Sequence, residues 1–175
     1  FTCPSSTSQV YLVGRGGSVA PSLGDHPAIT MMAALGDCTN VTSSTAIVMN
    51  EITTAASAWA LEQFIGPDAN IGASSTNATG LRNAFLEVAN LVDNSKGIAP
   101  GPSLPANTIL ETAKINTLAD VLSACNQPAS ATACQSLFAA TTEGSTIPSD
   151  TLDAALNIVR NPAAQVSAIF ALLAG

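Results

Sequence analysis

Charged side chains are scarce in this chain of 175 residues, since Asp, Glu, Lys and Arg together make up only 10% of it. Ordinary soluble domains carry about 25%. The net charge is −7, and the few basic residues are scattered along the chain: Arg15, Arg82, Lys96, Lys114 and Arg160. Nucleic-acid binding needs a clustered basic face that contacts several phosphates. We therefore expect no nucleic-acid partner, and an exterior solvated by Ser, Thr, Asn and Gln.

The chain also lacks a long apolar run. The longest one near the C-terminal end spans residues 166–174, whereas a membrane-spanning helix needs about 20 residues. We therefore expect no membrane span. The chain begins with Phe1 and not with Met, so we expect either that a leader has been removed or that a longer polypeptide contains this segment.

Histidine occurs once, at His26, and the motifs GxSxG, SxxK and HExxH are all missing. Any Ser–His or Cys–His catalysis would have to use this residue, and its neighbour Asp25 is too close along the chain to orient it as in a triad. We interpret His26 as a capping or surface residue. The glycine-rich stretch 14–17 lacks the GK[ST] of a phosphate-binding loop and predicts a turn. The sequence therefore predicts neither an enzyme nor a bound cofactor or metal.

A few acidic and amide side chains are candidates for a catalytic, carbohydrate-binding or calcium site. Glu51 and Glu62 fall on one face of a predicted helix, so they form a potential carboxylate pair for a hydrolase or a carbohydrate-binding module. Asp37, Asp68 and Asn70 offer loop oxygens of the kind that bind calcium, but they follow no DxDxDG pattern. We favour a solvated helix face for the glutamates and ordinary turn chemistry for the loop residues.

Four cysteines are present, an even number without a CxxC spacing. One histidine cannot complete a two-cysteine, two-histidine zinc site, so two disulfides are favoured over a metal site. Three connectivities are open, of which we favour Cys3–Cys38 and Cys125–Cys134. Disulfides imply an oxidising compartment, and we expect an extracellular or cell-surface location. The triplets that begin at Asn40 and Asn77 fit the N-glycosylation pattern.

The expected fold is all-α: an irregular bundle of six to seven helices with one N-terminal strand, held by the two disulfides. Residues 45–64, which contain the only Trp, form the predicted central helix, with a buried stripe at Val48, Ile52, Ala55 and Trp59. The other helices are predicted over 27–35, 79–94, 115–125, 132–141, 151–160 and 163–174. The single strand comprises Gln9, Val10, Tyr11, Leu12 and Val13. We divide the chain into an extended segment, 1–20, and a helical domain, 21–175.

Several phrases together resemble a helical module of large secreted bacterial surface proteins. They include QVYLVGRGG, MMAALGDC, VMNEITTAASAWAL, INTLADVLSAC and DAALNIVRNPA, and the resemblance covers nearly the whole chain. In such proteins the module lies beside immunoglobulin-like or carboxypeptidase-regulatory-like domains and β-propeller-type repeats. The resemblance implies an extracellular, multidomain context and brings no catalytic residues with it.

These observations favour an extracellular structural or adhesive surface protein, with strand 9–13 pairing either with another subunit of a filament or surface assembly or with a neighbouring β domain of the same polypeptide. The alternative is a secreted hydrolase or carbohydrate-binding module. A third hypothesis is a carrier that holds a small ligand between its helices.

Overall fold

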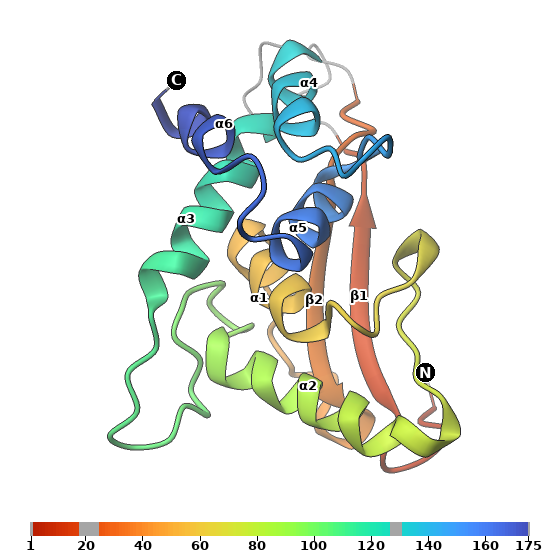
Figure 1. Ribbon diagram of the computed structural model, residues 1–175. Coiled ribbons are helices and arrows are strands. Elements are labelled where there is room, and N and C mark those ends of the chain that lie inside the picture. Colours follow the sequence, from red (N-terminus) through yellow and green to blue (C-terminus); the bar gives the residue numbers. More distant parts are fainter. Residues whose placement is uncertain (1, 18–24, 127–130, 175) are drawn as a thin grey trace.

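The structure is a computed structural model that describes residues 2–17, 25–126 and 131–174. Within these residues two strands and six α-helices are formed (Figure 1). Their bounds are β1 Gln9–Arg15, β2 Thr30–Asp37, α1 Glu51–Leu61, α2 Ala78–Leu91, α3 Thr112–Ser123, α4 Ala131–Ala140, α5 Thr151–Arg160 and α6 Val166–Ala171. Short 3-10 turns join several of them, at Cys38–Asn40, Pro67–Ala69, Ser75–Asn77, Ala124–Asn126 and Leu172–Ala174.

The two strands form an antiparallel sheet, which corrects the expected fold class. β1 pairs with β2 from Gln9 opposite Asp37 to Arg15 opposite Thr30, with one register shift between Val10 and Tyr11. The N-terminal strand is therefore not unpaired, and an all-α fold is wrong. The protein is a mixed α/β structure in which helices pack around a small hairpin-like sheet.

The largest error concerns residues 27–35, which were expected to form a helix and instead lead into and make up most of β2. Met, Ala and Leu are good helix formers, and the segment is rich in them. Met32, Ala33 and Ala34 are nonetheless buried in succession, because β2 lies between β1 and the helices. Tertiary burial on both sides overrides local propensity here.

α1 is the central helix, as expected, because it contacts β2, α2, α3 and α5. It begins later than predicted, after a capping box in which the Asn50 side chain accepts from Thr53 N (2.9 Å) and Asn50 N donates to Thr53 Oγ1 (2.9 Å). Its buried positions are mostly small: Thr53, Thr54, Ala55, Ala56, Ser57, Ala58 and Leu61. The predicted stripe is wrong at Trp59, whose side chain is 45% exposed.

The later helices follow their local signals closely. α3 buries Ile115, Leu118 and Leu122 on one side, as the spacing predicts. α5 has the predicted bounds, and the Asp150 side chain caps it by accepting from Asp153 N (2.9 Å). α6 is shorter than residues 163–174 and its flank Leu172–Ala174 is a 3-10 turn.

Both expected disulfides are present, Cys3–Cys38 and Cys125–Cys134. The first ties the N-terminal segment to the turn that follows β2, and the second joins the end of α3 to α4. The division of the chain at residue 20 falls within 18–24, outside the described residues, and β1 and β2 pair across that gap. In Figure 1, β1 is the strand farther from α1 and α3.

Candidate functional site

The outer edge of β2 is closed by side-chain hydroxyls from two helices. Three backbone N–H groups that point away from β1 donate to such groups: Thr30 to Thr151 Oγ1 (2.9 Å), Met32 to Thr54 Oγ1 (2.9 Å) and Ala34 to Ser57 Oγ (3.2 Å). Two carbonyls on the same edge are also satisfied, because Thr151 Oγ1 donates to Thr30 O (2.7 Å) and Asn94 Nδ2 donates to Ala34 O (2.7 Å). From Thr30 to Ala34 this edge is therefore closed to a further strand.

The outer edge of β1 has no such cover. In an antiparallel pair, residues opposite one another point their backbone groups either toward each other or both away. Thr30, Met32 and Ala34 point away from β1, so their register partners Arg15, Val13 and Tyr11 point away from β2. Among the described residues, the backbone N–H and C=O groups of these three form no backbone hydrogen bond outside the sheet. β1 therefore presents an open edge.

The side chains around this edge are mainly apolar. Leu12 is 41% exposed and lies on the face of the sheet that points away from Tyr11 and Val13. Gly14 shares the face of Leu12, and Met49 covers it so closely that a Cβ at Gly14 would overlap the Met49 methyl group. On the other face, the Tyr11 hydroxyl accepts from Ile71 N (3.3 Å). The loop that contains Ile71 thus reaches the phenol of Tyr11 and leaves the backbone edge unbonded.

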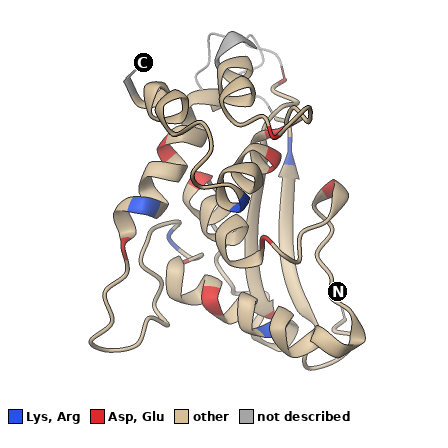
Figure 2. Ribbon diagram, viewed as in Figure 1, with Lys and Arg blue, Asp and Glu red and all other residues tan. Residues whose placement is uncertain are grey.

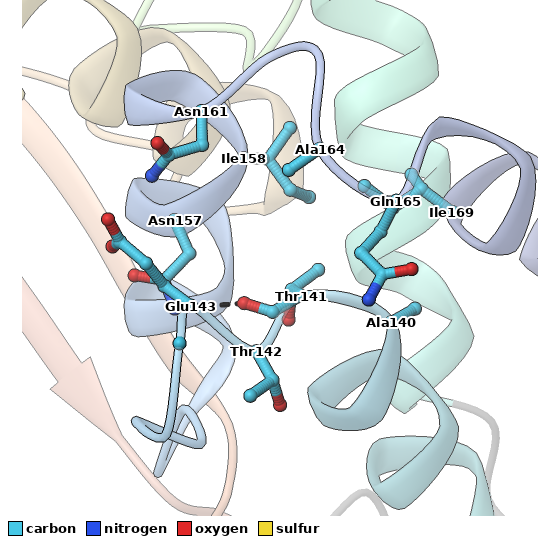
Figure 3. Close-up of a pocket in the computed structure, with 11 residues that line it drawn as sticks. Ala140, Thr141, Thr142, Glu143, Asn157, Ile158, Asn161, Ala164, Gln165 and Ile169 are labelled. Carbon is cyan, nitrogen blue, oxygen red and sulfur yellow. Dashed lines mark hydrogen bonds between the residues drawn. The ribbon is translucent and has the colours of Figure 1, made fainter.

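A polar cavity of about 420 Å³ lies between the end of α4, α5 and the segment before α6 (Figure 3). The two threonine hydroxyls of its lining donate to backbone carbonyls of α4: Thr141 Oγ1 to Leu137 O and Thr142 Oγ1 to Phe138 O (2.8 Å each). Asn157 Nδ2 donates to Thr141 O (2.9 Å). The lining holds one carboxylate, Glu143, and neither histidine nor cysteine, so it contains no nucleophile–base pair of the hydrolase type.

The carboxylate pair suggested by the sequence is not assembled. Glu51 begins α1 and accepts a hydrogen bond from the side chain of Asn126, whereas Glu62 follows the last residue of the same helix. Eleven residues of helix separate their backbones by about 16 Å along the axis. Glycoside hydrolysis needs two carboxylates about 5–10 Å apart. Glu51 instead joins the start of α1 to the turn after α3.

The residues considered as calcium ligands form other interactions instead. Arg82 Nη2 lies 2.6 Å from Asp37 Oδ2, and this hydrogen-bonded ion pair, with help from Gln9, lowers the pKa of Asp37. Asp68 lies in the Pro67–Ala69 turn, and Asn70 follows it and donates from Nδ2 to Pro67 O (3.0 Å). Within the described residues no group of three or more His, Cys, Asp or Glu side chains is placed to hold a metal ion.

The remaining predicted residues lie at accessible or half-buried positions. Asn40 and Asn77, the two sequon residues, are exposed at the ends of 3-10 turns, and their glycosylation stays a prediction. His26 is half-buried ahead of β2, and its Nε2 has no hydrogen-bond partner among the described residues. Its role also stays a prediction. Sequence reasoning missed the two contrasting edges, because residues 27–35 were expected to form a helix and not the partner strand of β1.

Figure 2 shows the acidic and basic positions of the described residues scattered over the ribbon. No described helix combines the length and apolar character needed to cross a bilayer. Comparison with known protein families, curated proteins and solved structures finds no match to this chain.

Proposed function

We propose that this protein is an extracellular structural or adhesive surface component that assembles through strand pairing at β1. The carrying observation is the contrast between the two edges of the sheet. Helix hydroxyls close the edge of β2, while among the described residues no backbone bond outside the sheet reaches Tyr11, Val13 or Arg15 of β1. An exposed edge strand without Lys or Pro is a template for pairing with another chain.

The edge is suited to a second copy of the same chain. If two β1 strands pair antiparallel with Val13 opposite Val13, then Tyr11 of each copy lies opposite Arg15 of the other. This register forms about six backbone hydrogen bonds. It also sets Leu12 opposite Gly14, which has no side chain, and next to Met49 that covers that glycine. At each end of the contact, the exposed side chains of Leu12 from one copy and Met49 from the other would thus become buried.

Other features support an extracellular setting. The two disulfides are consistent with an oxidising compartment, and a surface poor in charge is solvated by hydroxyl and amide groups. The motif resemblance to secreted bacterial surface proteins points the same way. No catalytic arrangement among the described residues competes with this proposal.

The test is the oligomeric state of edge variants, measured by sedimentation velocity over a concentration series. Deleting β1 would remove Tyr11 and Val13 from the packed sheet, so point variants are needed. Val13→Pro removes one outward N–H and no bond to β2, a position that tolerates proline in edge strands. Leu12→Lys adds a charge beside the edge without disturbing the core. Leu86→Lys, at an exposed leucine of α2, is the matched control.

We expect the unaltered protein and Leu86→Lys to associate with rising concentration, and both edge variants to remain monomeric with unchanged circular dichroism. A monomeric unaltered protein at all concentrations would overturn self-pairing. Association of Val13→Pro and Leu12→Lys as strong as that of the parent would overturn the use of the β1 edge.

A further inference from the structure

Trp59, the only tryptophan in the chain, lines two adjoining hollows of opposite character. It lies near the end of α1 with its side chain 45% exposed. Large aromatic side chains in α-helices are normally used to fill a core, and here the core face of α1 is filled by small residues instead. An exposed aromatic side chain at the junction of two hollows is available to a ligand.

The first hollow is an apolar groove of about 360 Å³ between α1, α3, α5 and α6. Its lining includes Leu118 from α3 and Val166 and Phe170 from α6. Phe170 is 57% exposed, so the groove is open along this side. The one charged residue that lines it is Lys114, which forms an ion pair with Glu111 one turn earlier. The groove is therefore suited to a hydrocarbon group.

The second hollow is a polar cleft of about 470 Å³ between the end of α1 and α2. Two carboxylates line it, Glu62 and Glu87, together with the amides of Gln63 and Asn77, and no basic residue does. Glu87 accepts from Asn90 Nδ2 (3.0 Å). The Glu62 carboxylate forms no ion pair with any described residue. The cleft therefore carries two negative charges without a counter-charge in its lining.

The basic side chain that contacts the backbone of Glu62 does not neutralise its carboxylate. Arg160 Nη2 donates to the backbone carbonyls of Glu62 (2.7 Å) and Ile65 (2.9 Å), where it caps the carbonyl end of α1. It lies beyond ion-pair distance of the Glu62 carboxylate, since the ion pairs formed by the described residues involve Arg15, Arg82, Lys96 and Lys114. The charge of the cleft is complementary to a cation.

We propose that the two hollows form one binding site for an amphipathic organic cation, whose hydrocarbon part lies in the groove and whose ammonium group lies in the cleft. Trp59 contacts both parts of such a ligand. A cation over the face of an indole ring is stabilised by the ring quadrupole, and the two carboxylates add Coulombic attraction. A neutral headgroup loses both contributions, and an anionic one is repelled.

The experiment uses the fluorescence of Trp59, which reports this site without interference from another tryptophan. The protein is titrated with three ligands that share an eight-carbon chain, each kept below its micelle concentration at constant ionic strength: octyltrimethylammonium chloride, octyl glucoside and sodium octanoate. We expect a saturable change with the cation and at least about tenfold weaker binding of the other two, given the size of cation–π and ion-pair contributions.

Variants separate the two halves of the site. Glu62→Gln and Glu87→Gln should each weaken binding of the cation by about threefold and leave binding of octyl glucoside unchanged. Phe170→Ala should weaken binding of both ligands, since it removes groove surface. Asp120→Asn, at an exposed acid of α3 that lines neither hollow, is the matched control and should change nothing.

Equal affinity for the cation and octyl glucoside, or no effect of the two glutamine variants, would overturn recognition of charge. Unchanged binding by Phe170→Ala would overturn use of the groove, and a fluorescence change that does not saturate with any ligand would overturn the site. Glu87, Asp120 and Phe170 are exposed and Glu62 is half-buried, and thermal unfolding of each variant verifies that it is folded.

Discussion

The hydroxyl of Thr151, at the start of α5, takes the place of a neighbouring strand beside Thr30 of β2. Thr30 N donates to Thr151 Oγ1 (2.9 Å), and the same hydroxyl donates to Thr30 O (2.7 Å). One side chain thereby satisfies both backbone groups of a buried edge residue. Thr54 of α1 likewise accepts from Met32 N (2.9 Å), but its one hydroxyl proton has Asn50 O at 2.7 Å as a nearer acceptor than Met32 O at 3.5 Å.

Replacing Thr151 by Val should therefore destabilise the protein by about 1–3 kcal/mol, because the buried N–H and C=O of Thr30 lose their partners while the side-chain shape is kept. Urea unfolding measures this change in free energy. Thr108→Val, at an exposed loop threonine, is the matched control and should alter stability little. Equal effects of the two variants would show that the hydroxyl does not close the edge of β2.

Removal of the two disulfides should have unequal effects. They close loops with sequence separations of 35 and 9 residues. The chain-entropy relation assigns about 4 kcal/mol to the longer loop and about 2.5 kcal/mol to the shorter one. The variants to compare by urea unfolding are Cys3→Ala with Cys38→Ala, and Cys125→Ala with Cys134→Ala. A larger loss from the second pair would contradict this ranking.

The pH dependence of stability should include a contribution from Asp93. The hydrogen bond from Lys96 Nζ (2.8 Å), followed by that from Ser95 Oγ (2.6 Å), lowers the pKa of Asp93 to about 2. In the unfolded chain the carboxyl has an ordinary pKa of about 3.9. The folded state therefore gains stability from the ionised carboxyl above about pH 4, and this gain is lost as the pH falls from about 4 toward 2.

Lys96→Met should raise the pKa of Asp93 but leave it below the ordinary value, because the Ser95 hydrogen bonds remain. An NMR titration of the side-chain carboxyl carbon measures it. Lys114→Met, which removes the partner of exposed Glu111, should leave the pKa of Asp93 unchanged. A pKa for Asp93 in Lys96→Met equal to that of the parent would contradict the role assigned to the lysine.

Two glycines should respond differently to alanine. A Cβ at Gly101 would overlap the carbonyl oxygen of Ala89, whereas nothing lies within 4 Å of a Cβ at Gly72. We expect Gly101→Ala to destabilise the protein by about 1–3 kcal/mol through overpacking. Gly72→Ala should be neutral or stabilise by up to about 1 kcal/mol, because it restricts the unfolded chain. Thermal unfolding measures both changes, and similar melting temperatures for the two variants would be contrary to the close packing at Gly101.

Local signals in the sequence determined much of the helical part. Ser149 and Asp150 predict a cap and a first-turn acid for a helix over 151–160, and the structure has these bounds with Asp150 itself as the cap, because capping depends on atoms within one turn. The spacing of Ile115, Leu118 and Leu122 predicts the buried side of α3. The even number of cysteines and their spacing were enough to favour the two disulfides that the structure contains.

Only the tertiary structure decided that residues 30–37 form a strand and that Trp59 lies at the surface. The segment of β2 has helix-forming residues, but β1 on one side and the hydroxyls of Thr54, Ser57 and Thr151 on the other satisfy its backbone in extended form. Those hydroxyls come from helices elsewhere in the sequence, so no local sequence pattern predicts their hydrogen bonds to this strand. Because small residues of α1 pack against this strand, Trp59 is left at the surface. The open edge of β1 and the two hollows beside Trp59 follow from that packing.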